Sequence, residues 1–380
     1  MANAWENVDM IAAEALTVMS DEMVIGNLTM RDKTSDFNTT PNGYKVGESV
    51  RIKTRPDYEA KEFAGAITPQ EIRSSKRNLA IEKHFDISVE MTSREKSMNM
   101  DDLTEEVIAP AARRLAEKVD VYLGSKIAQA AGLYASNTLL GSSADVALAR
   151  KAAILQQLES NRFALVNLDL EAALLGQDWF NQSQTRGQDG ERAFREGFMG
   201  RTMGMDFFSS INFPDVTHTG GTGTSLTDNG AGGNTNNKIG VSTLTIDALT
   251  GQIEAGDRIQ IAGVKRPLIA AAQAVATSTT VSLVDPITEI IPDNAAITVI
   301  GSSQAMTFQG CIFDDRSIAA AFPILDKPSD KPSFILSDNG VSIRVVQGYD
   351  MSSKTETMSL DLLCGATAYD PRRMTLLGDY

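Results

Sequence analysis

Residues 44–91 constrain the fold most, because their second half alternates apolar and polar side chains over an unusual length. One face of that half carries six apolar residues, with only Lys83 out of pattern: Leu79, Ile81, Phe85, Ile87, Val89 and Met91. At roughly 3.3 Å per residue, a strand of this length measures about 40 Å, more than a compact domain covers. We therefore expect an extended hairpin that projects from the rest of the chain.

An isolated hairpin is only marginally stable in water, so the apolar face of this one must pack on another surface. The simplest source is a second copy of the same chain. The alternative is an ordinary long hairpin inside a large sheet. Between the two arms, residues 55–74 combine prolines with mixed charges, which suits a solvated or partner-facing tip better than a core.

Composition limits the class of protein. With 380 residues, of which 42% are hydrophobic, the chain can bury a core, and its length suggests two or three domains. A formal net charge of -14 argues against tight binding of duplex DNA, since that affinity comes chiefly from Lys and Arg. Residues 1–23 lack the basic region of a signal peptide, and no apolar run is long enough to span a bilayer. We therefore expect a product that starts in the cytosol.

Cysteine and histidine are too few for a disulfide framework or a recognisable zinc site. The two cysteines, Cys311 and Cys364, are expected to be buried free thiols. The two histidines, His84 and His218, have no nucleophile or carboxylate at a convincing spacing, and we expect both at the surface.

No other motif indicates catalysis or cofactor binding. The glycine-rich stretch 220–233 lacks the Gly-Lys-Ser/Thr of a phosphate-binding loop, so a linker is the better interpretation. Asp314 and Asp315 are adjacent, so their side chains point apart and make a poor pair of catalytic carboxylates. We therefore expect a protein that is not an enzyme and that uses no cofactor or metal.

An amphipathic helix is predicted near the start of the chain. Its apolar residues recur at helical spacing from Val8 to Met23. The opposite face is acidic, and residues 1–30 contain no Lys or Arg. Such a face either attracts a basic helix or is simply solvated.

A second helix is predicted after the hairpin. It begins at a cap, Asp101 or Asp102, and Gly132 closes it. Pro110 lies inside the pattern, and an interior proline costs a helix about 3 kcal/mol or more. We therefore expect a kink at Pro110 or a helix that properly begins there.

The predicted secondary structure changes in the middle of the chain, first to alternating helices and strands and then to strands and turns. A helix at 144–158, a strand at 163–168 and a helix at 170–175 indicate an α/β segment, and the polar stretch 181–195 is expected to be an exposed loop. Composition then shifts at Thr217, and a small separate β-domain is predicted from strands at 242–246, 258–261, 280–284 and 296–300.

After residue 304 the sequence returns to the mixed helix-and-strand pattern that precedes Thr217. A buried strand and a short helix are predicted between residues 305 and 325, and two alternating strands follow at 341–346 and 355–363. Because the mixed helix-and-strand pattern returns after the β-domain, we interpret that domain as an insertion into one parent fold.

This order of parts resembles the tailed-phage major capsid proteins of the Hong Kong 97 fold, especially the P-twenty-two-type coat proteins with an inserted β-domain. Four strings carry the resemblance: AARRLAEKV from Ala111, GDRIQIAGVK from Gly256, CIFDDRSIAAA from Cys311, and the closing SIRVVQGYDMSSKTETMSLDLLCGATAYDPRRMTLL. Of the first two, GDRIQIAGVK is the more specific.

The resemblance implies an α+β fold of the Hong Kong 97 capsid type, with a small inserted β-barrel-like domain. It divides the chain into an N-terminal arm, 1–42; an extended-loop hairpin with flanking strands, 43–98; a spine helix and peripheral domain, 99–160; the first part of an axial domain, 161–218; the inserted β-domain, 219–303; the second part of the axial domain, 304–338; and closing peripheral-domain strands, 339–380.

In this family the protein self-assembles, as hexamers and pentamers, into the icosahedral head of a tailed phage. The resemblance therefore implies a virion protein, made in the bacterial host cytoplasm, whose partners are itself, a scaffolding protein, a portal protein and a decoration protein. The shell would enclose double-stranded DNA without sequence-specific binding, and no membrane is involved. Two alternatives stay open: the shell of an encapsulin-like compartment and, more distantly, a cytosolic hydrolase or binding protein with a β-domain.

Particular residues follow from the resemblance. The extended loop would lie over a neighbouring subunit, which makes its charged residues candidate interface contacts: Arg55, Asp57, Glu59, Lys61 and Glu62. Glu14 falls about where related proteins meet a basic helix of the scaffolding protein, and Pro110 is the candidate hinge of the spine helix. Four charged residues of the inserted domain either make contacts within or between capsomers or form a solvated rim: Asp257, Arg258, Lys265 and Arg266.

Overall fold

A computed structural model describes most of the chain. The described residues are 3–38, 47–53, 62, 65, 76–92, 104–130, 132–156, 158, 161–182, 187–214, 216–227, 236–329 and 331–379. The chain divides into two compact units: the first comprises Met1–Arg51, Asn78–Lys126 and Ile318–Ala368, and the second comprises Ile52–Arg77, Ile127–Ser317 and Tyr369–Tyr380. Helix takes 25% of the chain and strand 38%, so the fold class is α+β, as predicted.

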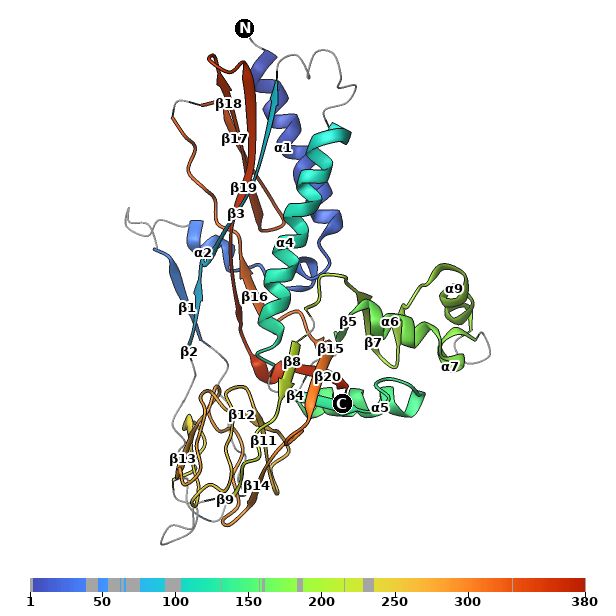
Figure 1. Cartoon of the computed structure of the whole chain (residues 1–380), viewed down its shortest axis with the longest axis vertical. Helices are drawn as coiled ribbons and strands as arrows, with labels where there is room; N and C mark the ends of the chain where they lie inside the picture. Colours follow the sequence, from blue (N-terminus) through green and yellow to red (C-terminus); the bar gives the residue numbers. More distant parts are fainter. Residues whose placement is uncertain are drawn as a thin grey trace. The chain divides into compact units, whose positions relative to one another are not determined.

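An antiparallel sheet forms the body of the first unit (Figure 1). Its strands are β3 (Lys83–Thr92), β16 (Ile318–Ala321), β17 (Ser333–Asp338), β18 (Val341–Asp350) and β19 (Thr355–Ala368). β19 pairs with β3, β16 and β18. Asn339 and Gly340 both have positive φ, 48° and 78°, and this turn sets the register of the hairpin formed by β17 and β18. The two closing strands, β18 and β19, are confirmed, each several residues longer than predicted.

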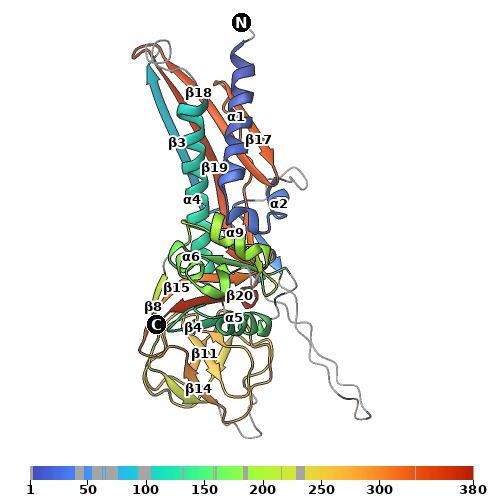
Figure 2. The same cartoon turned by 90° about the vertical axis from the view of Figure 1, so that its right-hand side faces the viewer.

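Two long helices accompany this sheet (Figures 1 and 2). α1 (Asn3–Glu22) contacts β17 and β18 and is followed by η1 (Gly26–Leu28) and α2 (Thr34–Asn38). The predicted first helix is thus confirmed, and it begins earlier than its apolar pattern. In α4 (Ala109–Ile127), Tyr122 meets Phe85 of β3 edge to face, with ring centroids 6.3 Å apart.

The helical run that contains Pro110 changes type just before the proline. Thr104–Ile108 is π-helical, and the α-helical part begins at Ala109. Proline cannot donate the backbone hydrogen bond that an α-helix needs in its interior, so a change of register ahead of it is expected. The alternative of a helix beginning at Pro110 is confirmed to within one residue, while the predicted caps, Asp101 and Asp102, lie outside the described residues.

The predicted end of this helix at Gly132 is wrong. The helix stops at Ile127, and Gly132 opens a strand. A Cβ at Gly132 would lie 2.6 Å from Oγ1 of Thr375 and 2.8 Å from the carbonyl oxygen of Met374. This glycine therefore serves close packing between two strands and does not cap the helix.

The prediction of one long returning strand is also wrong. The chain forms two strands, β2 (Lys76–Ala80) and β3, and breaks between them at Ile81 and Glu82. β2 pairs with β1 (Ser49–Lys53), whereas β3 pairs with β19 over ten residues. The alternative of a strand inside a large sheet is thus right for residues 83–92. The alternation of apolar and polar residues continues across the break, because the odd-numbered residues are the more buried ones in both strands, as at Leu79 and Met91.

The second unit contains a seven-stranded sheet with the order β4-β20-β15-β5-β7-β6, in which β8 also pairs with β15. Its strands are β4 (Gly132–Ser136), β5 (Phe163–Val166), β6 (Arg201–Thr202), β7 (Met205–Ser209), β8 (Val216–Thr219), β15 (Ala305–Phe313) and β20 (Met374–Asp379). The predicted strand at 163–168 is confirmed as β5, two residues shorter.

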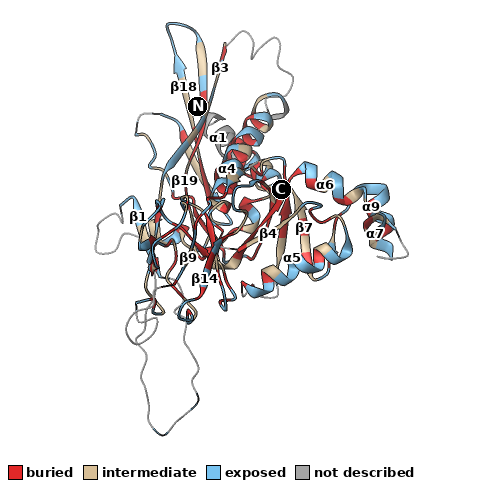
Figure 3. Ribbon diagram, turned by 60° about the horizontal axis from the view of Figure 1, so that its bottom comes forward, coloured by how far each residue is buried: buried red, intermediate tan, exposed pale blue. Residues whose placement is uncertain are grey.

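Helices of this unit are exposed along much of their length (Figure 3). They are α5 (Ser143–Leu155), α6 (Leu168–Leu175), α7 (Asp178–Asn181) and α9 (Gln188–Glu196), whereas the short η4 (Pro371–Arg373) has no exposed residue. Side chains cap three of them: Ser142 accepts from the N–H of Asp145, Asn167 from that of Leu170, and Asp370 from that of Arg372 in η4. The helices α5 and α6 were predicted, but the expectation of a loop at 181–195 is wrong, because α9 occupies its second half.

The segment predicted to be an inserted domain, a name that we keep for it, contains a hydrophobic core cluster of its own. All four predicted strands are confirmed, as β10 (Thr243–Thr245), β11 (Arg258–Ile261), β13 (Thr280–Ser282) and β14 (Ala296–Val299). Two short strands were not predicted, β9 (Thr224–Leu226) and β12 (Leu268–Ile269). They complete a sheet of order β12-β11-β14-β9 beside the pair β10-β13, around buried aliphatic residues between Leu244 and Val299. The linker interpretation of 220–233 is therefore wrong at β9.

A strand replaces the short helix predicted after β15. Ile318–Ala321 is β16, and its residues pair with Gly365 to Ala368 of β19. All four β16 residues are buried. The helix preference of the three alanines is overridden because their small side chains fit a buried strand position. The seven-part division of the chain stays a prediction.

Candidate functional site

The described residues contain no group of three or more His, Cys, Asp and Glu side chains that could hold a metal ion. Cys311 and Cys364 are buried free thiols, as predicted, and burial raises the pKa of both thiols, which suppresses thiolate reactivity. None of the helices in the described ranges is both long and apolar enough to cross a membrane.

The adjacent carboxylates Asp314 and Asp315 point apart, as predicted. Asp315 is exposed, whereas Asp314 is buried and pairs with Arg373, whose Nε donates to Oδ2 of Asp314 at 2.8 Å. The hydroxyl of Ser317 donates to Oδ1 of Asp314 at 2.7 Å. A carboxylate satisfied in this way braces a turn and is not available as a catalytic base.

A row of polar side chains crosses the sheet of the first unit. Nε2 of His84 lies 3.1 Å from Oδ2 of Asp361, and Arg344 donates from Nε to Oδ1 of the same carboxylate at 3.0 Å. Arg344 also donates from Nη1 to the carbonyl of Asp326 at 2.7 Å. The surface position of His84 is confirmed, but its expected lack of a carboxylate is wrong: the register pairs His84 with Leu363, which places Asp361 diagonally opposite.

Asp120 of α4 is fully buried and holds the turn that follows α1. Its Oδ2 accepts hydrogen bonds from the backbone N–H groups of Val24 at 2.8 Å and Ile25 at 3.2 Å, and its Oδ1 accepts one from Gly26 at 2.9 Å. Burial raises the pKa of Asp120, and the three donors partly offset that rise. On α1 itself, Glu14 is exposed, and its contact with a scaffolding protein stays a prediction.

Both arms of the predicted hairpin are tied at their root to other segments of the second unit. Tyr369 donates from its hydroxyl to the carbonyl of Lys53, the last residue of β1, at 2.9 Å. Arg77 of β2 donates from Nη2 to Oδ1 of Asp285 at 2.5 Å and to the carbonyl of Val284 at 3.3 Å. Burial raises the pKa of Asp285, and the guanidinium of Arg77 partly offsets the rise.

The candidate contacts of the extended loop fall mostly outside the described residues. Those outside are Arg55, Asp57, Glu59 and Lys61. Glu62 is described and exposed. A contact with a neighbouring subunit stays a prediction for all five.

Asp257, at the entry to β11, organises the start of the inserted domain. Its Oδ1 lies 2.7 Å from Nε2 of His218, and its Oδ2 accepts from the backbone N–H groups of Gly221 at 3.1 Å and Glu254 at 2.6 Å. A Cβ at Gly221 would lie 2.4 Å from the carbonyl oxygen of Gln252, so only glycine fits there. The expected lack of a carboxylate near His218 is wrong, because its partner is 39 residues away in the sequence.

Two arginines connect the inserted domain to the rest of the second unit. Arg258 donates from Nη2 to the carbonyls of Ala128 at 3.3 Å and Ala130 at 3.0 Å, and burial lowers its pKa to about 10. Arg266 donates from Nε to the carbonyl of Leu155, at the end of α5, at 3.3 Å. Backbone carbonyls accept hydrogen bonds from a buried guanidinium without adding a second charge, although the Nε of Arg258 has no partner among the described residues.

Three of the four predicted contact residues of the inserted domain are therefore buried within the chain. Asp257, Arg258 and Arg266 are at most 8% exposed, so a solvated rim is wrong for them. Lys265 is exposed, and a contact of this residue with another subunit stays a prediction.

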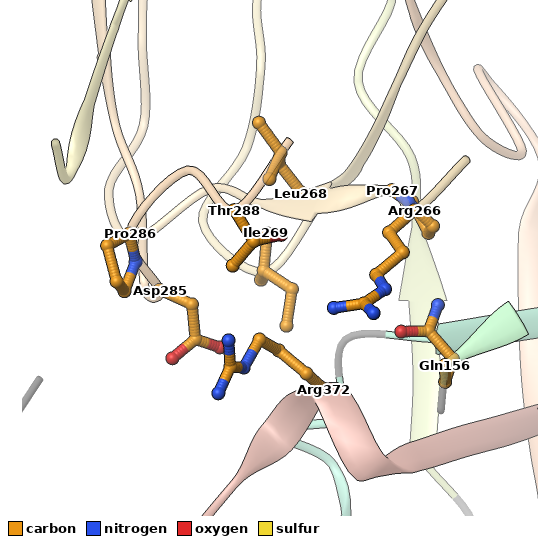
Figure 4. A pocket seen from close by; sticks show the side chains of 9 residues that line it. All are labelled: Gln156, Arg266, Pro267, Leu268, Ile269, Asp285, Pro286, Thr288 and Arg372. Carbon is orange, nitrogen blue, oxygen red and sulfur yellow. The ribbon is translucent and has the colours of Figure 1, made fainter. Parts of the chain in front are cut away.

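A small cavity lies at this junction (Figure 4). It is lined by Gln156, Arg266, Pro267, Leu268, Ile269, Asp285, Pro286, Thr288 and Arg372. In Figure 4 the carboxylate of Asp285 faces the guanidinium of Arg372, and the amide of Gln156 lies beside Arg266. Arg372 is also held by Asp370, with Nε to Oδ1 at 2.8 Å and Nη2 to Oδ2 at 3.0 Å. The space admits about one water molecule and is too small for an organic substrate.

Comparisons with known proteins place the fold. No protein-family model and no curated protein matches this chain. A chain from Mycobacterium phage Che8 is similar in structure, with a TM-score of 0.51 and 12% sequence identity, over 93% of this chain and 90% of that one. The two share one fold. It is the Hong Kong 97 type that the sequence predicts.

Two further structures are more weakly similar. The capsid of the cyanophage P-SCSP1u has a TM-score of 0.47 and 11% identity, over 88% of this chain and 84% of that one. A virus-like particle from Pyrococcus furiosus has a TM-score of 0.43 and 9% identity, over 98% of this chain and 99% of that one. Membership of the P-twenty-two-type branch stays a prediction.

Proposed function

We propose that this chain is the major capsid protein of a tailed, double-stranded DNA bacteriophage, and that its copies assemble as hexamers and pentamers into an icosahedral shell. The observation that carries the proposal is the fold shared with the Mycobacterium phage Che8 protein over 93% of this chain. A likeness that covers 93% of this chain supports a shell subunit better than an enzyme with one borrowed domain.

The open edge of the first unit's sheet supports a role in assembly. Among the described strands, β3 pairs with β19 alone, so its other edge offers backbone donors and acceptors to a second chain. Exposed edges of this length invite pairing between chains unless they are covered. Coverage by a neighbouring subunit would satisfy them.

The joint in the spine helix supports a subunit that adapts to unequal positions. The π-helical turn Thr104–Ile108 lies directly before Pro110, and short π-helical segments are common where helices bend or adjust. In a shell of hexamers and pentamers one sequence must occupy several environments. Pro110 is the hinge that this proposal assigns, and identical subunit conformations in immature and mature shells would contradict it.

The acidic chain suits a container for DNA. Its net charge of -14 disfavours tight binding to phosphates, which would hinder packaging and release. The proposed partners are other copies of the chain, a scaffolding protein that meets the acidic face of α1 near Glu14, a portal protein and a decoration protein. The finished product would reside in the virion after synthesis in the bacterial cytoplasm.

The proposal is tested by expressing the chain alone and together with candidate scaffolding proteins, and by examining the products by electron microscopy. Closed shells, or discrete capsomers that close only with scaffold, are expected. Shells that close without scaffold and hold protein cargo would replace the phage head with an encapsulating compartment. A stable monomer under both conditions would reject a shell of either kind.

A further inference from the structure

The root of the extended hairpin meets the inserted domain and the last segment of the chain in one group of contacts. These contacts are made by Arg77, Asp285, Tyr369 and Lys53, with Arg372 beside Asp285. We name this group the hairpin clasp. The three segments that it joins are far apart in the sequence, since Arg77 and Asp285 are 208 residues apart.

We propose that the hairpin clasp sets the position of the extended hairpin, so that Arg77, Asp285 and Tyr369 are positioning residues for shell assembly. The inference rests on the proposed function, because it assigns the hairpin a role between subunits. It goes beyond that function by making the inserted domain the support of the hairpin.

Each arm of the hairpin has its own tie. The hydroxyl of Tyr369 donates to the carbonyl of Lys53 at 2.9 Å, and this bond holds the outgoing arm at the last residue of β1. Arg77 holds the returning arm through a charge-assisted hydrogen bond to Oδ1 of Asp285 at 2.5 Å. A hairpin fixed at both arms cannot swing about one strand end.

Burial makes the Arg77 tie stiff. The side chains of Arg77 and Asp285 are 21% and 10% exposed, so water competes poorly for either group. Asp285 also faces Arg372, which Asp370 holds in place with two hydrogen bonds. The carboxylate therefore interacts with two guanidinium groups, one from the hairpin and one from near the end of the chain, and a displacement of the hairpin root would remove one of its two counter-charges.

The first test uses the unassembled full-length chain. Arg77→Met removes the tie, and Tyr369→Phe removes only the hydroxyl of the second tie. Hydrogen exchange of the amides in β1 and β2 is expected to rise at least tenfold in Arg77→Met and a few-fold in Tyr369→Phe. Arg114→Met serves as the matched control, because its partner Glu117 and its own guanidinium are exposed. Unchanged exchange in both clasp variants would overturn the proposal.

The second test separates positioning from general stability. Asp285→Asn, added to Arg77→Met, removes the buried charge that has lost one of its two counter-charges, and is expected to restore the thermal midpoint. It should not restore the rate of shell assembly measured by light scattering with scaffold, since the tie is still absent. Recovery of assembly together with the midpoint would show a merely structural role and overturn the proposal. If the wild-type chain forms no shells, the proposed function fails, and the exchange measurement still decides whether the clasp holds the hairpin root.

Discussion

Asp120 gives the sharpest prediction about stability. Three backbone N–H groups, those of Val24, Ile25 and Gly26, donate to its carboxylate, and Asp120 itself is fully buried. Asp120→Ala removes both carboxylate oxygens and so leaves all three donors without their acceptor. The turn that carries these donors would lose its anchor on α4, because Asp120 is the side chain that accepts from them within the described part of the chain.

The magnitude follows from the donors left behind. Each buried donor without a partner costs about 1–3 kcal/mol, and the full set would therefore cost several kcal/mol. Part of this cost is offset, because the substitution also removes a carboxylate whose charged form is disfavoured by burial, as the raised pKa of Asp120 indicates. We expect Asp120→Ala to lower the free energy of unfolding by about 3 kcal/mol.

The assay is urea unfolding of the unassembled chain, followed by circular dichroism in one buffer. Asp21→Ala is the matched control, since Asp21 is an exposed acid at the end of α1. The control is expected to change the free energy of unfolding by less than about 0.5 kcal/mol. A loss for Asp120→Ala as small as that of the control would refute the reasoning.

The same carboxylate predicts a pH dependence. Because the pKa of Asp120 is raised in the folded chain, the folded state binds the proton more tightly than the unfolded state between the ordinary value of 3.8 and the raised one. The stabilisation is thus fully present below pH 3.8 and is lost as pH rises through the folded pKa. The free energy of unfolding of the wild type, relative to that of Asp120→Asn, should therefore fall as pH rises across this window. A difference that stays constant or grows from pH 4 to pH 8 would contradict the raised pKa.

Three further predictions concern other parts of the chain. Arg373→Met leaves Asp314 buried without its counter-charge and should cost about 3–5 kcal/mol in urea unfolding; wild-type stability would contradict it. Cys311 and Cys364 should react with a thiol reagent far more slowly in the native chain than after denaturation, because burial raises the pKa of both; rapid native labelling would disprove their burial. Glu14→Lys should reduce scaffold-dependent particle yield without changing the circular dichroism of the chain, and a normal yield would remove Glu14 from the scaffold contact.

Elements defined by local pattern could be predicted from the sequence. The four strands of the inserted domain were found because alternating apolar residues are separated by glycines, as at Gly251, Gly256 and Gly263. α4 was found because its apolar residues recur every four positions, and Pro110 marked where its α-helical part begins. In these segments the local preference and the final packing agree.

Elements decided by distant partners could not be predicted. The alanines of β16 favour a helix locally, and only pairing with β19 makes them a strand. His84 and Asp361 are 277 residues apart, and Arg77 and Asp285 are 208 apart, so no spacing rule could join them. The single long strand was mispredicted for the same reason. β2 pairs with β1 and β3 pairs with β19, yet apolar and polar residues alternate in the same way through both strands.

The central claim is that many copies of this chain build one closed shell. The most direct measurement is cryo-electron microscopy of particles made by co-expressing the chain with a candidate scaffolding protein. We predict closed icosahedral shells in which the subunit density fits this fold and β3 lies against a neighbouring subunit. A chain that stays monomeric with and without scaffold would contradict the account.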